Sequence, residues 1–454
     1  MSKTTPKKDR ESNRLTGRLS RYARVTTSVG GLAARVAGEK YLGLKMDRGK
    51  HASDLRLALG GLKGPLMKVA QMLATIPDAV PKEYAAELAQ LQADAPPMGW
   101  PFVKRRMAAE LGLDWEKKFR SFSRESAAAA SLGQVHKAET LKGEQVACKL
   151  QYPDMASAVE ADLKQLKLIF ALFERVDPAF RTKQIHAEIT DRLREELDYG
   201  REAQALSLFA SMLEGEEGVH VPKLHPKLST SRLLTMEWVD GQRLMTFRDA
   251  PQKTRNALAL NMFRAWYIPF YHYGVIHGDP HPGNYLVGKD NTINLLDFGC
   301  VRIFPPKFVA GVIALYRALE KDDAEEITEA FRNWGFKDLK KEVIDILTIW
   351  AKFVYGPVLE NRKRLIDETE SGLYGRATAR KVHFALRDVG GVEVPREFVF
   401  MDRAAIGLGS VFFHLKAEIN WYRLFNDLIA DFDEKALARR QREILKRFGF
   451  QVSG

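Results

Sequence analysis

The chain has 454 residues and a formal net charge of +12, with hydrophobic and charged fractions of 45% and 28%. This length allows two or three domains with a sizeable core, and the composition is that of an ordinary globular protein. Two cysteines exclude a disulfide framework, and no apolar run approaches the roughly 18 residues of a membrane-spanning helix.

The first 50 residues hold 13 lysines and arginines against four acidic residues, so most of the basic surplus lies at this end. We expect residues 1–54 to form a basic, partly disordered leader without a secretory signal. Such a segment can stay solvated or contact anionic lipid. Nucleic acid is not an expected partner, because the sequence shows no recognition module for it.

Helical spacing predicts a helical extension over residues 55–125, interrupted by prolines and by a linker at residues 95–99. The pattern changes at Ser126. Residues 127–138 read AAAASLGQVHKA, and Glu144–Leu150, EQVACKL, alternate like a strand that Lys149 ends.

A long helical region is predicted over residues 156–210, with an interruption at Asp177-Pro178. Residues 233–239, LLTMEWV, predict a strand that leads into Asp240-Gly241, as a hinge between two lobes would. Asn256–Tyr273 predicts an apolar core helix.

The most informative stretch is residues 274–302, GVIHGDPHPGNYLVGKDNTINLLDFGCVR. It predicts two short strands, Tyr285–Val287 and Thr292–Leu296, joined by a turn. This hairpin would bring Asn284 and Asp297 to the same end of two paired strands. Phosphoryl transfer needs one carboxylate to orient the attacking hydroxyl, and an amide and a second carboxylate to hold magnesium. Asp279 is therefore the catalytic candidate, and Asn284 and Asp297 are the metal-ligand candidates.

A different interpretation takes His277, Asp279 and His281 as a metal cluster of the hydrolase type. That interpretation leaves Asn284 and Asp297 without a function. A stiff loop at residues 281–283 that aims Asn284 inward is the simpler one.

Phosphoryl transfer also needs a strand-borne lysine for the nucleotide phosphates, and Lys149 in Val-Ala-Cys-Lys fits. The segment before it has alanines where protein kinases have glycines, and the added methyl groups restrict backbone conformations with positive φ. Phosphate binding by this segment should therefore differ from that in protein kinases. The candidate nucleotide contacts are Ala128, Ala129, Ala130, Ser131, Lys149, Glu237 and Val239.

These motifs resemble those of the UbiB-type atypical kinases, the AarF and coenzyme Q-linked branch of the protein-kinase-like superfamily. AAAASLGQVH, VACKLQYP, EELDYGREA, HGDPHPGN and LLDFG stand in the family's order between about Ala58 and Trp421. The resemblance implies a two-lobed, protein-kinase-like α+β fold with an N-terminal helical extension and C-terminal helices. The N-lobe would cover residues 126–240, the C-lobe residues 241–340 and the C-terminal helical region residues 341–454.

The resemblance also implies roles for single residues. Glu202 would be the helical glutamate that pairs with Lys149, and Glu196 and Asp198 would form the family's Glu-x-Asp motif. Lys68 and Gln71 would belong to a Lys-x-Gly-Gln motif that gates the substrate side, although Ala70 replaces the family's glycine here. That methyl group bears on how tightly the gating segment docks.

The implied activity is an atypical kinase or ATPase that uses ATP or ADP with Mg²⁺ in support of ubiquinone biosynthesis. The expected partners are a lipid or quinone-precursor molecule, a membrane surface and a lipid-biosynthesis complex. The expected location is the cytoplasm, peripherally on the inner membrane, or the matrix side of the mitochondrion in a eukaryote. The C-terminal segment Asp431–Phe450 is a basic helix that either packs on the body or lies on a membrane.

Besides a basic nucleic-acid binder, which would bind DNA or RNA with a steep salt dependence, two other functions fit parts of the sequence. One is a small-molecule kinase of the aminoglycoside or choline type, against which the alanine-rich segment and EELDYGREA argue. The other is a nucleotide-binding regulatory scaffold of a lipid-biosynthesis complex that transfers no phosphate. Intact Asp279 and Asn284 disfavour the scaffold, which has no need of both.

Overall fold

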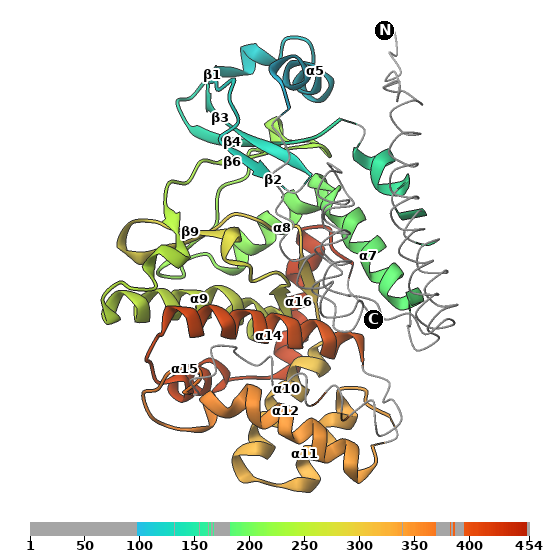
Figure 1. Cartoon of the computed structure of the whole chain (residues 1–454), viewed down its shortest axis with the longest axis vertical. Coiled ribbons are helices and arrows are strands. Elements are labelled where there is room, and N and C mark those ends of the chain that lie inside the picture. Colours follow the sequence, from blue (N-terminus) through green and yellow to red (C-terminus); the bar gives the residue numbers. More distant parts are fainter. Residues whose placement is uncertain are drawn as a thin grey trace, which may run out of the picture. The chain divides into compact units, whose positions relative to one another are not determined.

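The computed structural model describes residues 98–451, with gaps at 131, 154, 162, 165–166, 168–181, 338, 369–381, 383–384 and 386–394. It divides into two compact units (Figure 1). The first takes the chain to Arg201 and then His225–Glu237, and the second takes Glu202–Leu224 and the chain from Trp238. Strands and helices occur in both, so the expected α+β class is confirmed.

The first unit is built on an antiparallel sheet of strand order β1-β3-β4-β6, with β2 added beside β3. Helices α5 and α7 and two short 3₁₀ turns accompany the sheet. The elements of this unit are α5 (Trp100–Leu111), η1 (Trp115–Lys118), β1 (Phe119–Phe122), β2 (Ala128–Ala130), β3 (Gly133–Thr140), β4 (Gln145–Gln151), α7 (Thr182–Glu196), η2 (Pro226–Leu228) and β6 (Leu233–Glu237).

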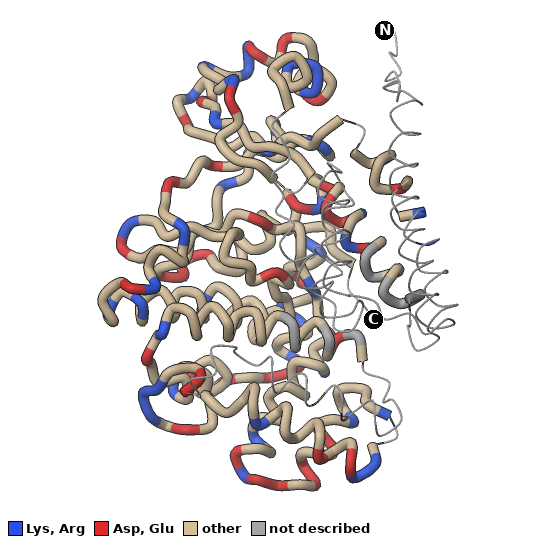
Figure 2. The backbone as a smooth tube through the Cα atoms, in the orientation of Figure 1, with Lys and Arg blue, Asp and Glu red and all other residues tan. Residues whose placement is uncertain are grey.

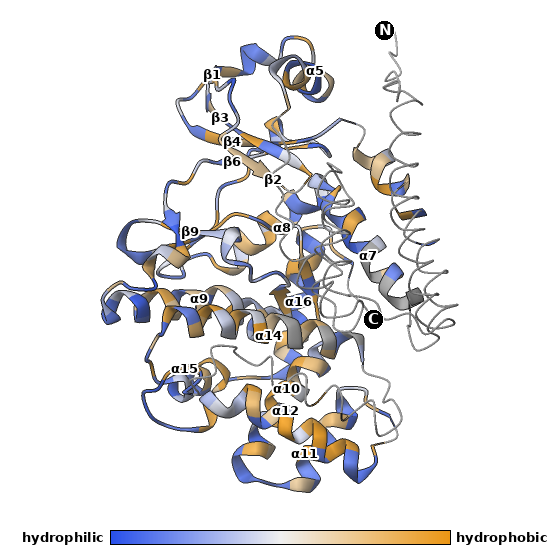
Figure 3. Cartoon of the chain, viewed as in Figure 1, coloured by the Kyte–Doolittle hydropathy of each residue, from blue (hydrophilic) through white to orange (hydrophobic). Residues whose placement is uncertain are grey.

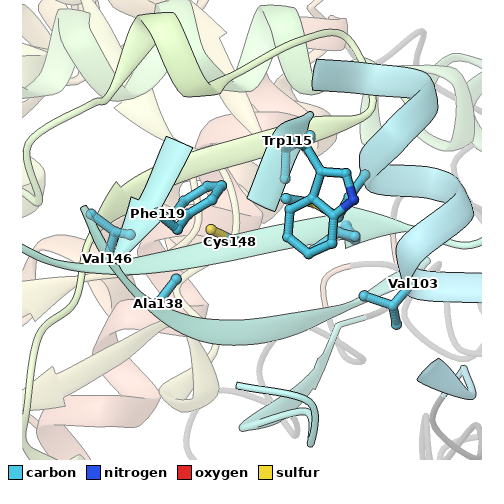
Figure 4. Packing of buried hydrophobic residues seen from close by; sticks show 9 residues of the cluster. Val103, Trp115, Phe119, Ala138, Val146 and Cys148 are labelled. Carbon is cyan, nitrogen blue, oxygen red and sulfur yellow. The ribbon is translucent and has the colours of Figure 1, made fainter. Parts of the chain in front are cut away.

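One face of this sheet is covered by α5 and η1 (Figure 4). Alternate residues of each strand point to this face, as the two-residue period of a strand requires. Trp115 and Phe122 meet edge to face with ring centroids 5.1 Å apart. The buried cluster consists of Val103, Met107, Trp115, Phe119, Ala138, Val146, Cys148, Leu150 and Leu233.

Three features of the first unit differ from the sequence expectations. Strand β4 continues past Lys149 to Gln151, because its last residues still pair with β3. Strand β1 lies before Ser126 and pairs with β3, so the sheet includes residues assigned above to the helical extension. The helical region breaks at Leu197-Asp198, between α7 and α8 (Tyr199–Met212), whereas Asp177-Pro178 lies outside the described residues.

The second unit combines short strands with the described C-terminal helices. Its elements are β5 (Val219–His220), β7 (Gln242–Arg243), η3 (Leu244–Phe247), α9 (Gln252–Tyr273), β8 (Val275–His277), η4 (Pro282–Asn284), β9 (Tyr285–Val287), η5 (Lys289–Asn291), β10 (Ile293–Leu295), β11 (Val301–Ile303), α10 (Pro306–Lys321), α11 (Ala324–Asn333), α12 (Lys341–Leu359), α14 (Arg396–Leu415), α15 (Trp421–Ile429) and α16 (Glu434–Arg447).

The predicted hairpin is confirmed: β9 and β10 pair antiparallel, with Tyr285 opposite Leu295. The turn uses left-handed backbone at Asp290 and Asn291, which these residue types tolerate. The predicted core helix is α9, which ends at Gly274 in the left-handed conformation typical of a helix C-terminus.

The C-terminal helix α16 packs on the second unit through its apolar face. Leu437 and Leu445 are buried, and Gln441 donates to the carbonyl oxygens of Tyr273 (2.9 Å) and Phe304 (2.8 Å). Figure 3 shows hydrophobic and hydrophilic residues side by side on the helices of this region, as amphipathic packing requires. Of the two expectations for this segment, packing on the body is therefore confirmed.

Charged residues of both signs are interspersed along the described chain (Figure 2). The basic leader, residues 1–54, lies outside the described residues. None of the helices described is long and apolar enough to span a bilayer.

Candidate active site

Lys149 lies on β4, on the sheet face opposite the buried cluster of Figure 4. Its strand neighbours Cys148 and Leu150 point into that cluster, so alternation directs Lys149 away from it. The residue pairs with Val135 of β3 on one side and with Leu234 of β6 on the other. Two flanking strands thus fix the backbone from which the lysine projects.

The alanine-rich segment is extended backbone, not a glycine-like loop. Ala128–Ala130 form β2 and pair with β3, with Ala130 opposite Gly133. Gly133 has no room for a side chain, because a Cβ there would lie 2.1 Å from the carbonyl oxygen of Leu150. The alanine methyl groups are compatible with this extended conformation, and Ser131 lies outside the described residues.

Tyr199 lies close to both Lys149 and Gly133, an arrangement that the sequence did not indicate. The Lys149 ammonium lies 5.1 Å from the centre of its ring. Its hydroxyl lies 2.9 Å from where a Cβ of Gly133 would stand. The ring is buried, with 1% of the residue exposed. In EELDYGREA the family resemblance assigns roles to the charged residues only, and the role of this tyrosine follows from the structure.

The Glu-x-Asp motif stands at the junction of α7 and α8. Asp198 caps α8, because its Oδ1 accepts a hydrogen bond from the Arg201 backbone N–H at 3.0 Å. Glu196 is half-buried at the end of α7, and Glu202 is buried at 3% exposure in the first turn of α8. Lys149 and Glu202 belong to different compact units, so their pairing stays a prediction.

Of the remaining residues predicted to contact the nucleotide or to gate the site, two lie at the end of β6 and two lie outside the described residues. Glu237 is the last residue of β6, opposite Val146, and Val239 follows the strand that was expected to include it. Strand β6 is therefore shorter than predicted. Lys68 and Gln71 lie outside the described residues.

The second unit brings together Asp279 and Asn284. The Asn284 side-chain amide donates to the Asp279 carboxylate at 3.0 Å and to the Asp279 carbonyl oxygen at 3.1 Å. Asp297 stands at the same end of the hairpin, because the Leu296 N–H donates to the Asn284 carbonyl at 2.9 Å. The Oδ1 atom of Asp297 accepts the Gly299 N–H at 2.8 Å.

His277 connects the loop that carries Asp279 to the loop that carries Asp297. Its Nε2 lies 2.6 Å from the Asp297 carbonyl oxygen, and its Nδ1 accepts the Asp279 N–H at 3.2 Å. These partners assign the proton to Nε2, since a carbonyl oxygen can only accept. Both ring nitrogens are used, which argues against the metal cluster of His277, Asp279 and His281. No group of three metal-binding side chains is found among the described residues.

Two residues lie against Pro280, which follows Asp279: Tyr285 through a hydrogen bond and Gly407 through close packing. The Tyr285 hydroxyl donates to the Pro280 carbonyl at 2.5 Å. Burial, and to a smaller extent the charge of Asp279, raise the pKa of Tyr285 far above its usual value, so it stays a donor. A Cβ on Gly407 of α14 would lie 2.5 Å from the Pro280 ring. Neither contact was predicted from the sequence.

The donor set at the hairpin end suits Mg²⁺, which binds hard oxygen ligands. The amide nitrogen of Asn284 faces Asp279, so its carbonyl oxygen is the atom that could bind a cation. Asp297 would supply a carboxylate oxygen. The candidate ligands are therefore compatible with the predicted magnesium site.

Residues 90–331 match the family model described as ABC1 atypical kinase-like domain. The chain is 32% identical over 250 residues to Atypical kinase COQ8, mitochondrial, of Saccharomyces cerevisiae, covering 55% of this chain and 50% of that protein. It is 32% identical over 282 residues to Protein ACTIVITY OF BC1 COMPLEX KINASE 8, chloroplastic, of Arabidopsis thaliana, covering 60% and 37%. The chain thus spans half or less of the length of these curated relatives.

A solved structure is also similar. It is a Mycobacterium tuberculosis protein in complex with erythromycin, with a TM-score of 0.61 and 25% sequence identity. The match covers 84% of this chain and 96% of that one.

Proposed function

The chain belongs to the ABC1 atypical kinase-like family, and from this premise we propose that it binds Mg-nucleotide and hydrolyses ATP or transfers its γ-phosphoryl group to a small or lipid-like acceptor. The observation that carries the proposal is the hydrogen bond between Asn284 and the Asp279 carboxylate, at the hairpin end where Asp297 also stands. A phosphoryl-transfer site needs these three side chains together.

Each residue has a separate task in this proposal. Asp279 orients the attacking hydroxyl or water and accepts its proton, and the Asn284 amide fixes the carboxylate for that purpose. His277 holds the backbone of both loops, so the two carboxylates keep their relative position. Lys149 attracts the nucleotide phosphates. A magnesium ion held by Asn284 and Asp297 would neutralise charge that develops on the phosphates.

We place the activity in ubiquinone biosynthesis, with a quinone precursor or another lipid as the acceptor and a membrane surface as the location. The family resemblance and the similarity to the yeast protein named COQ8 support this part of the proposal.

The test is Mg-dependent ATP turnover by the purified full chain, with and without anionic liposomes and a phenolic quinone-precursor analogue. Asp279→Asn should lower turnover by about 10²–10⁴-fold, the usual contribution of a general base. Asp297→Asn should abolish the turnover that magnesium stimulates. Asp290→Asn is the matched control, because it makes the same change in the turn of the same hairpin, where asparagine tolerates the left-handed backbone.

Wild-type turnover in both Asp279→Asn and Asp297→Asn would refute the mechanism. Tight Mg-nucleotide binding without turnover under any of these conditions would instead favour the regulatory scaffold.

A further inference from the structure

We propose that Tyr199 is a positioning residue that holds the Lys149 ammonium in place for the nucleotide phosphates. The inference rests on the proposed function, because it assigns Lys149 to those phosphates. Tyr199 stands between Asp198 of the Glu-x-Asp motif and Glu202. It would act through Lys149 and not on the substrate itself.

The contact between the two side chains is a cation–π interaction. The Lys149 Nζ lies 5.1 Å from the centre of the Tyr199 ring, within the roughly 6 Å range of such interactions. The ring face carries negative charge density and attracts the ammonium. The tyrosine is 1% exposed, so water competes little for the ring, and the attraction is stronger than on an open surface.

The ring itself is held from two directions. The Tyr199 backbone N–H donates to the Ser231 carbonyl oxygen at 3.3 Å, which ties the start of α8 to the turn before β6. The Tyr199 hydroxyl packs against Gly133, where a Cβ would come within 2.9 Å of it. A glycine in β3 therefore lets the tyrosine reach under the lysine.

The same tyrosine stands in the first turn of α8, whose start is set by the Asp198 cap. A shift of this turn would move the ring away from Lys149. The Glu-x-Asp motif can thus influence the phosphate lysine through the backbone of α8, without touching the nucleotide.

If Tyr199 only supported the fold, replacing it would weaken nucleotide binding equally with and without Lys149. A double-mutant cycle distinguishes that role from the positioning role. The affinity for Mg-ADP is measured by calorimetry in the wild type, Tyr199→Leu, Lys149→Met and the double variant. We expect Tyr199→Leu to weaken binding about fivefold when Lys149 is present and less than about twofold when it is absent. Tyr199→Phe should recover most of the coupling, because it keeps the ring.

Phe119→Leu is the matched control, since it removes a buried ring from the same sheet on the face away from Lys149. A second readout needs no nucleotide. After reductive ¹³C-methylation, the Lys149 methyl signal, identified by its loss in Lys149→Met, should be shifted by the ring current of Tyr199. The shift should collapse in Tyr199→Leu and persist in Phe119→Leu.

Equal losses of affinity from Tyr199→Leu in both backgrounds, with an unshifted methyl signal, would overturn the inference and leave the proposed function standing. Wild-type affinity in Lys149→Met would overturn the role of Lys149 and this inference with it.

Discussion

His277 is the residue on which the geometry of the candidate active site depends most. It is 2% exposed and joins the Asp279 amide to the Asp297 carbonyl. The indole N–H of Trp266 donates to the backbone carbonyl oxygen of His277 at 3.1 Å, and the His277 ring packs on Phe209 and Phe298. A buried histidine whose two ring nitrogens are hydrogen-bonded and whose ring packs on aromatic side chains has one low-energy orientation.

Replacing His277 by phenylalanine should keep the packing and lose both hydrogen bonds. Leaving the Asp297 carbonyl and the Asp279 amide unpaired should lower the free energy of unfolding by about 1–3 kcal/mol. Turnover should fall at least about tenfold, because the two carboxylates lose their common support. Chemical denaturation and Mg-ATP turnover measure the two effects.

The neighbouring His281 offers the comparison for stability. It is exposed, and its Nδ1 accepts the Gly283 N–H at 3.0 Å. His281→Ala should therefore change the unfolding free energy by less than about 0.5 kcal/mol. Equal stability of His277→Phe and wild type would show that the two hydrogen bonds make no net contribution to the free energy of unfolding.

At the residue scale the sequence predicted the chemical groups better than their supports. Asn284 and Asp297 were expected at one end of a hairpin, because strand residues on both sides of a turn signal dictate that pairing locally. Tyr199, Tyr285 and Gly407 were not predicted. Tyr199 contacts Lys149, and Tyr285 and Gly407 approach Pro280; these contacts arise from tertiary packing, which leaves no local pattern in the chain.

At the scale of elements, α14 limits where the loop that carries Asp279 can lie. Its residue Gly407 faces the Pro280 ring, and any Cβ would approach to 2.5 Å. Pro280 directly follows Asp279, so a displaced proline moves the carboxylate that we propose to be catalytic.

Gly407→Ala should therefore lower turnover about tenfold or more and destabilise the protein by about 1–3 kcal/mol, the usual cost of overpacking. Gly356→Ala in α12 is the control, because among the described residues no atom outside its chain neighbours and its own helical turns lies within 4 Å of the added methyl group. That variant should change stability by less than about 1 kcal/mol, because the gain from alanine's helix propensity is set against the restriction that Pro357 places on the residue before it. Thermal unfolding and steady-state kinetics measure both variants. Equal stability and equal turnover of Gly407→Ala and Gly356→Ala would contradict the prediction.

The elements themselves were predictable to different degrees. The hairpin β9–β10, the helix α9 and most of β4 follow from short-range periodicity and turn residues. The break before α8 contains neither proline nor glycine, but Asp198 three residues before Arg201 is a capping signal that could have indicated it. Strand β1, four residues long, is stabilised by pairing with β3 and has no independent signature.

At the scale of the molecule, acid should weaken the first unit through His136. This residue is fully buried in β3, with Nε2 2.7 Å from the Gln134 amide nitrogen and Nδ1 2.8 Å from the Ser123 carbonyl oxygen. The carbonyl assigns the proton to Nδ1, so Nε2 accepts from Gln134. Burial lowers the pKa of His136, although the hydrogen bond to Ser123 raises it in part.

Because the folded state binds this proton less readily than the unfolded chain, stability should fall as the pH drops below the unfolded value of about 6.5. The loss continues until the pH reaches the lower pKa of the folded state. Denaturation at pH 7.5, 6.5 and 5.5 should show a flatter profile for His136→Gln, with a lower stability at neutral pH. His414→Gln, at an exposed site in α14, should retain the wild-type slope. If His136→Gln and the wild type lost stability equally as the pH falls, the acid sensitivity would not come from His136.

The chain crosses between its two units three times, after Arg201, after Leu224 and after Glu237. During synthesis the ribosome therefore releases β4 well before β6, its partner on the far side from β3. Until Leu233–Glu237 emerges, the strand that carries Lys149 has an open edge, and open edges recruit other strands. A nascent chain halted near Arg201 should need a chaperone, whereas one that extends past Glu237 can close its first sheet.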